Sequence, residues 1–142
     1  MYNGPNEFPQ DAVLIANELL GILQLHLQDY DELLVLIQAQ QAHAVNCDPE
    51  GLVSSIDEIN LRMEGICSNR QMLCQSRDRL IDFYGAEQDH RVRRAIKVLP
   101  KRYQSALLVL IEAIDQKVKE CSKEIKESGL LFERGLNYLE GL

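Results

Sequence analysis

The sequence predicts an all-α protein: an elongated antiparallel three-helix bundle, built from a long coiled-coil hairpin and a third, C-terminal helix. Apolar residues recur in alternating steps of three and four along most of the chain, which is the spacing of helices that pack on one another. Helix-breaking residues cluster at two places, near residues 46–49 and 85–100, and so separate three long helical stretches. At 142 residues the chain has the size of one domain, and we expect residues 1–142 to form a single helical unit.

The first helix is expected over about residues 11–44. Its seam in the three-four pattern consists of Leu20, Leu23, Leu27, Tyr30, Leu34, Ile37, Gln41 and Ala44. Further apolar residues lie beside this seam, namely Val13, Ile15, Leu19, Ile22, Leu33 and Leu36. Because the apolar stripe is wide enough to face two neighbours, we expect this helix to be the central one.

The second helix is expected over about residues 49–84. Asp48 supplies an acidic N-cap, Pro49 suits the first helical position, and Gly85 is a natural C-terminal stop. The buried stripe is predicted to contain Leu52, Ile56, Ile59, Met63, Ile66, Arg70, Leu73, Arg77, Leu80 and Tyr84. The turn before the helix is short, so the first two helices must run antiparallel.

A connector over residues 85–100 and a third helix over about 101–140 complete the prediction. The connector has room for one short helix before Pro100 interrupts it. The stripe of the third helix is predicted to be Tyr103, Leu107, Leu110, Ile114, Val118, Cys121, Ile125, Phe132, Leu136 and Leu139, with a weak point around residues 128–129.

Charge is distributed unevenly along the chain. Residues 1–61 carry ten acidic side chains and no Lys or Arg, whereas residues 62–142 carry twelve acidic and fifteen basic ones, so the net charges of −10 and +3 add to −7. Six basic residues fall within 91–102, a density that also occurs in nucleic-acid-binding segments. An acidic protein repels a polyanion, so we expect a solvated connector partly neutralised by the first helix, and no nucleic-acid partner.

Residue clusters that resemble metal sites are incomplete. Glu87 and His90 form one Glu-x-x-His element, but a di-iron bundle needs two copies and two further carboxylates. His26 has Asp29 and Asp31 nearby, yet these flank a seam residue and are expected to point toward solvent. We expect no metal site and no cofactor.

Other signatures of catalysis are also missing from the sequence. The four cysteines lack C-x-x-C spacing, which favours buried reduced thiols: Cys47, Cys67, Cys74 and Cys121. There is no Gly-rich phosphate loop and no nucleophile-elbow motif, so we expect a protein that is not an enzyme. The longest apolar run spans six residues, 106–111, and Met1 does not open a signal peptide. The expected location is the cytoplasm, without stable membrane insertion.

Several segments together resemble the FlgN-like family of flagellar export chaperones. They are LLGILQLHLQDYDELLVLIQAQQAHAV, DPEGLVSSIDEINLRMEGI, NRQMLCQSRDRL and, after the connector, SGLLFERGLNYLEGL. The resemblance implies a cytoplasmic chaperone that binds hook-associated proteins of the hook-filament junction, prevents their premature assembly and delivers them to the export gate. It also implies that neither ATP nor a cofactor is used.

The last thirteen residues are the predicted partner-binding segment. Some of its apolar residues continue the core stripe and others form a second stripe without an evident partner, and together they are Leu131, Phe132, Leu136, Tyr138, Leu139 and Leu142. An amphipathic client helix laid along them would be a helix-in-groove contact. Packing of the second stripe on the first helix, or on a second copy in a homodimer, stays open. The alternative function is a self-associating structural or sensory coiled-coil bundle with no flagellar role.

Overall fold

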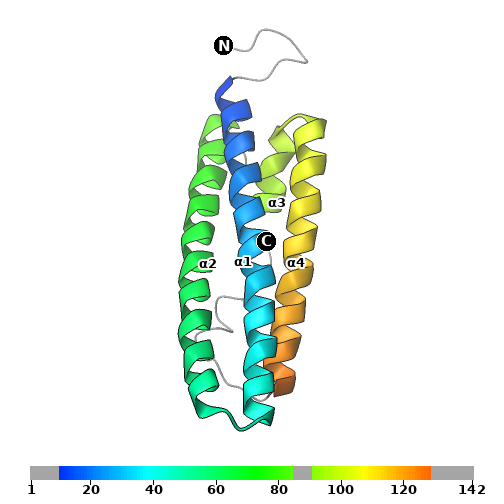
Figure 1. The fold of residues 1–142 in the computed structure, drawn as a ribbon. Helices are drawn as coiled ribbons and strands as arrows, with labels where there is room; N and C mark the ends of the chain where they lie inside the picture. Colours follow the sequence, from blue (N-terminus) through cyan, green and yellow to red (C-terminus); the bar gives the residue numbers. More distant parts are fainter. Residues whose placement is uncertain (1–9, 85–90, 129–142) are drawn as a thin grey trace.

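A computed structural model describes residues 10–84 and 91–128, and in this part of the chain it confirms the all-α bundle (Figure 1). The helices are α1 (Gln10–Val45), α2 (Pro49–Tyr84), the single-turn α3 (Val92–Ala95), the 3₁₀ helix η1 (Ile96–Val98) and α4 (Lys101–Ser128). The first two helices begin and end within one residue of the bounds expected from the sequence. Beyond Ser128, the expected remainder of the third helix lies outside the described residues.

Helix α1 is the centre of the molecule. It packs against antiparallel α2 on one side and against parallel α4 on the other, while α3 and η1 contact the end of the bundle where α4 begins (Figure 1). The wide apolar stripe of α1 explains this position, since a helix with one narrow seam could bury it against a single neighbour only.

The turn between α1 and α2 is fixed by a Schellman motif and an N-cap. Backbone N–H groups of Cys47 and Asp48 bond to the carbonyls of Ala44 and His43, at 3.2 and 2.9 Å, and Cys47 has a φ of 52°. The Asp48 carboxylate then accepts a bond from the N–H of Gly51 at 3.1 Å, which caps α2. The capping residue is the one expected from the sequence.

Gly51 occupies the first turn of α2 because there is no room for a side chain. The His43 imidazole lies 3.1 Å from the Asp48 carboxylate, directly over this glycine. A Cβ at position 51 would collide with both groups, so the helix accepts the lower propensity of glycine there.

The core of α1 runs between the predicted seam and the residues beside it. Fully buried positions include Ile15, Leu19, Leu23, Tyr30, Leu33 and Ile37. The seam residues Leu20, Leu27 and Leu34 are only half-buried, and Ala44 is exposed. The reason is that α1 has two neighbours, so the most enclosed line lies between its two contacts rather than along one of them.

The stripes of α2 and α4 follow the predicted pattern with local exceptions. Buried residues of α4 are Leu107, Ile111, Ile114, Val118, Cys121 and Ile125, so Ile111 takes the place predicted for the half-buried Leu110. In α2, Ile56 is exposed and Ser55 is buried instead. The Ser55 hydroxyl donates to the carbonyl of Gly51 at 2.8 Å, which satisfies the buried polar group.

The Gln104 side chain links the connector to the start of α4. Gln104 donates from its amide nitrogen to the carbonyls of Leu99 and Lys97. The carbonyl of Pro100 in turn accepts bonds from the N–H groups of Tyr103 and Gln104, both at 3.0 Å. Pro100 therefore immediately precedes the first turn of α4, where its missing backbone N–H costs no helical hydrogen bond.

Candidate partner-binding surface

The partner-binding residues expected from the sequence all lie outside the described residues: Leu131, Phe132, Leu136, Tyr138, Leu139 and Leu142. Their role as a client-binding segment stays a prediction. The described part of the chain carries a different apolar surface, which was not predicted from the sequence.

A shallow groove of about 420 Å³ lies between α1 and α2. Val35 and Leu36 of α1 and Leu61 of α2 form its apolar lining, and Asp31, Glu32, Glu58 and Arg62 surround them. Val35 and Leu61 are 63% and 64% exposed, which is unusual for large aliphatic side chains that sit beside each other on a helical hairpin.

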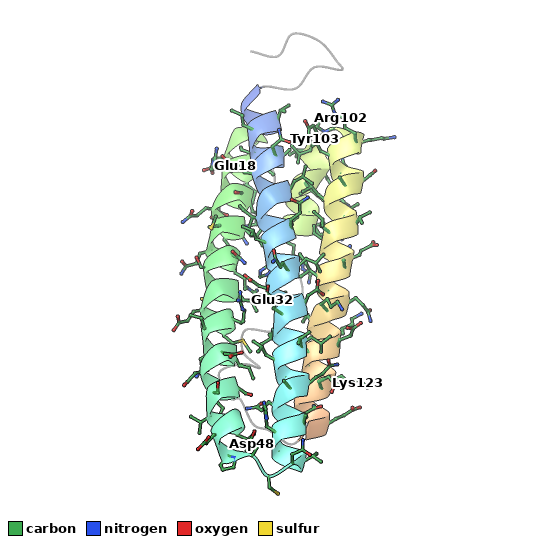
Figure 2. The ribbon with its side chains drawn as sticks, viewed as in Figure 1. Glu18, Glu32, Asp48, Arg102, Tyr103 and Lys123 are labelled. Carbon is green, nitrogen blue, oxygen red and sulfur yellow. The ribbon has the colours of Figure 1, made fainter. Side chains whose placement is uncertain are left out.

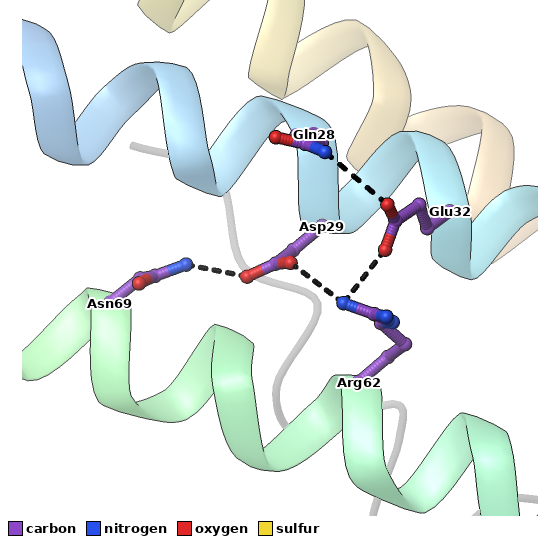
Figure 3. Close-up of polar contacts among 5 residues, drawn as sticks. All are labelled: Gln28, Asp29, Glu32, Arg62 and Asn69. Atoms are coloured by element: carbon purple, nitrogen blue, oxygen red, sulfur yellow. Dashed lines mark hydrogen bonds and ion pairs between the residues drawn. The ribbon is translucent and has the colours of Figure 1, made fainter.

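A polar cluster borders this groove on the side nearer the middle of the bundle (Figure 3). Arg62 of α2 reaches the carboxylates of Glu32 and Asp29 on α1, at 2.7 and 3.3 Å. Asn69 donates to the other oxygen of Asp29 at 2.7 Å, and Gln28 donates to Glu32 at 3.4 Å. The cluster joins the two helices and fixes their relative register.

Three further exposed apolar residues, Leu14, Leu25 and Met72, lie along the same two helices. Together with the groove residues Val35, Leu61 and the half-buried Leu36, they form a longer surface, here called the α1–α2 face. Leu14, Leu25 and Leu36 follow one another at intervals of eleven residues, as do Leu61 and Met72. Eleven residues make slightly more than three whole turns, so each series stays on one side of its helix. The ion pair between Glu18 and Arg79, 2.6 Å apart, also lies on this face. Figure 2 places Glu18 and Glu32 at two heights along α1.

The aspartates near Tyr30 do not both point toward solvent, and that expectation was wrong for Asp29. Its carboxylate faces α2, as described above, and its side chain is only 19% exposed. Asp31 points the other way and pairs with Lys117 of α4 at 3.3 Å. The two acids therefore attach α1 to its two neighbours instead of forming a surface pair.

One base of the connector, Arg93, pairs with acids of α4 and not with the first helix, which was expected to neutralise the connector in part. Arg93 pairs with Asp115 at 2.8 Å and lies 3.9 Å from Glu112, both on α4. Arg102 lies over the ring of its neighbour Tyr103, 4.9 Å from the centroid (labelled in Figure 2). The chain folds back at Pro100, which brings Arg93 beside the acids of the helix that follows.

His26 is a buried polar residue at the centre of α1. Its ring meets that of Tyr30 edge to face, with centroids 4.8 Å apart, and neither ring nitrogen has a hydrogen-bond partner in the described structure. Burial, and secondarily the charge of Arg70, lowers the pKa of His26 to about 4. The imidazole is therefore neutral at physiological pH.

The cysteines are free thiols, but only one is buried. Cys121 lies in the core, 3.8 Å from the carbonyl of Tyr30, and burial raises the pKa of its thiol to about 12. Cys67 is half-buried, and the expectation of burial was wrong for Cys47 and Cys74, which are exposed. Cys47 is exposed because it occupies the tip of the turn after α1.

Within residues 10–84 and 91–128, no group of three His, Cys, Asp or Glu side chains is arranged to hold a metal ion. The helices described there are also too polar over any long window to cross a membrane. Comparisons with family models, curated proteins and solved structures found no match.

Proposed function

We propose that this protein is a cytoplasmic export chaperone that binds a terminal helix of hook-associated junction proteins, keeps them from assembling early and passes them to the flagellar export gate. The proposal rests first on the order of sequence segments that resemble FlgN-like chaperones. It needs neither a cofactor nor a catalytic residue, because the chaperone acts by covering an apolar helix of its client.

One structural observation supports the assignment of the client site to the last thirteen residues. The core cluster of the described residues extends from Ala12 to Ile125 and draws on all five helices. A bundle with its own core has no evident need of the apolar residues that follow Ser128. An apolar segment in excess of the core is a common feature of partner-binding sites.

The double variant Leu131→Ala, Tyr138→Ala tests the site. It removes the second stripe but keeps the residues that continue the core pattern, and anchor residues of a helix-groove contact each contribute on the order of 1–2 kcal/mol. We expect titration calorimetry with a synthetic terminal helix of a junction protein to show affinity at least about tenfold lower, with an unchanged melting temperature.

The matched control is Val109→Ala, because Val109 is 67% exposed on α4. It should bind the helix like the unmodified chain. If the double variant bound normally but melted much earlier, the segment would be part of the core, and the chaperone proposal would lose its site.

A further inference from the structure

The α1–α2 face presents apolar residues at matching heights on its two helices. The pairing of Arg62 with Glu32 and of Arg79 with Glu18 sets the antiparallel register of α1 and α2. In this register Leu61 lies beside Val35 in the groove, and Met72 lies at the height of Leu25. The face therefore contains two pairs of exposed apolar residues, and each pair has one residue from α1 and one from α2.

Two ion pairs of this face are oriented alike, with the acid on α1 and the base on α2. They are Glu18 with Arg79 and Glu32 with Arg62, whereas Asp31 and Glu58 beside the groove belong to neither pair. Rotation by 180° about a line along the groove exchanges the two helices. It would place the acid of each of these two pairs over the base of the same pair in the other copy, and Val35 and Leu25 over Leu61 and Met72.

We propose that the α1–α2 face binds a second copy of this chain, with the two-fold axis running along the groove. Four helices then form the interface, two from each copy, and α1 of each copy lies over α2 of the other. This inference does not depend on the proposed chaperone function, because it uses only contacts of α1 and α2.

A second copy is the occupant favoured by this pattern because the face is complementary to itself, as an isologous interface must be. The face is about 33 Å long, from Leu14 to Leu36 at 1.5 Å per residue, and about 20 Å wide, the breadth of two helices. It offers roughly 650 Å² per copy, somewhat less than the roughly 800 Å² typical of stable complexes, so we expect a weak, micromolar dimer.

Sedimentation equilibrium of the full chain tests the interface directly. The unmodified protein should change from monomer to dimer between about 1 and 100 μM. Leu61→Asp should weaken the dimer about tenfold or more, since the buried charge would have no partner, and should leave helicity and melting temperature unchanged because the residue is exposed in the monomer. The control Val109→Asp changes an equally exposed apolar residue on α4 and should dimerise normally. A protein that stays monomeric at 100 μM, or a dimer indifferent to Leu61→Asp, overturns the proposal.

A charge exchange tests the position of the axis. Glu18→Arg gives a chain with two bases at this height, and Arg79→Glu gives a chain with two acids, so each variant alone should dimerise more weakly than the unmodified protein. An equimolar mixture should recover the unmodified affinity, because both cross-copy contacts become pairs of opposite charge. If the mixture associated no better than the separate variants, the two-fold axis along the groove would be wrong.

Discussion

At the scale of single residues, His26 is the clearest case of a polar group whose surroundings decide its chemistry. The sequence placed it near two aspartates, whereas in the fold it is fully buried against Tyr30 and both aspartates face other helices. A neutral, buried imidazole without hydrogen bonds costs stability, and a charged one would cost more.

The pH dependence of stability follows from the lowered pKa of His26. The unfolded chain takes up this proton near pH 6.5, but the folded chain does so only near pH 4. Protonation therefore favours unfolding, and the His26 contribution to the free energy of unfolding should fall by about 2 kcal/mol between pH 7 and pH 5. Urea denaturation at the two pH values measures this loss, and His26→Leu should reduce it to the small remainder caused by other groups. Equal losses in the two proteins would show that His26 is already protonated in the folded state at pH 5.

Single-residue predictions from the sequence failed where they depended on a neighbour distant in the chain. Asp29 was expected in solvent because it flanks a seam residue, but Arg62 and Asn69 of α2 reach it. The basic connector was expected to be partly neutralised by the first helix, but the turn at Pro100 brings Arg93 of the connector to Asp115 of α4. The helix bounds, in contrast, depend on local signals such as Asp48 and Pro49, and these were predicted well.

At the scale of elements, the two-sided packing of α1 explains why its seam was only partly predicted. The three-four pattern identifies residues that face one neighbour, as in a two-stranded coiled coil. With α2 and α4 both in contact, the positions between the two contacts become the most buried, and Leu33 is more enclosed than Leu34. The sequence indicated a wide stripe but not which line within it would be the most enclosed.

A pair of alanine substitutions measures this difference. Leu33 is fully buried and Leu34 half-buried, so Leu33→Ala should lower the free energy of unfolding by about 3 kcal/mol, and Leu34→Ala by about half as much. Leu25→Ala, at a residue that is 54% exposed, serves as the control and should change stability by less than about 0.5 kcal/mol. Chemical denaturation of the three variants gives the order, and a larger loss for Leu34→Ala would place the core along the originally predicted seam.

At the scale of the whole molecule, charge complementarity between the two halves of the sequence is realised as contacts of α1. Its acids pair with Arg62 and Arg79 of α2 and with Lys117 of α4. Each such exposed pair contributes at most about 1 kcal/mol, so burial of the apolar stripes is the main source of stability. The pairs instead favour the observed register over shifted ones, in which like charges would meet.

The architecture was predictable because hydrophobic periodicity identifies the long helices and the broad face that each of them buries. The α1–α2 face was harder to predict from the sequence. Leu61 and Met72 look like ordinary helix residues until α1 and α2 are paired and leave them exposed beside Val35 and Leu25. The client of the proposed chaperone is harder still, because many amphipathic helices share the same apolar spacing.

The central claim is that the segment after Ser128 binds a client helix that the bundle itself does not need. Calorimetric titration of a junction-protein terminal helix into the full chain, and into a chain that ends at Ser128, tests this claim most directly, with circular dichroism to check that both are folded. We predict saturable binding to the full chain and none to the shortened chain, at closely similar helicity per residue. Equal affinity of the two chains for the helix would contradict the claim and move the client site to the described bundle.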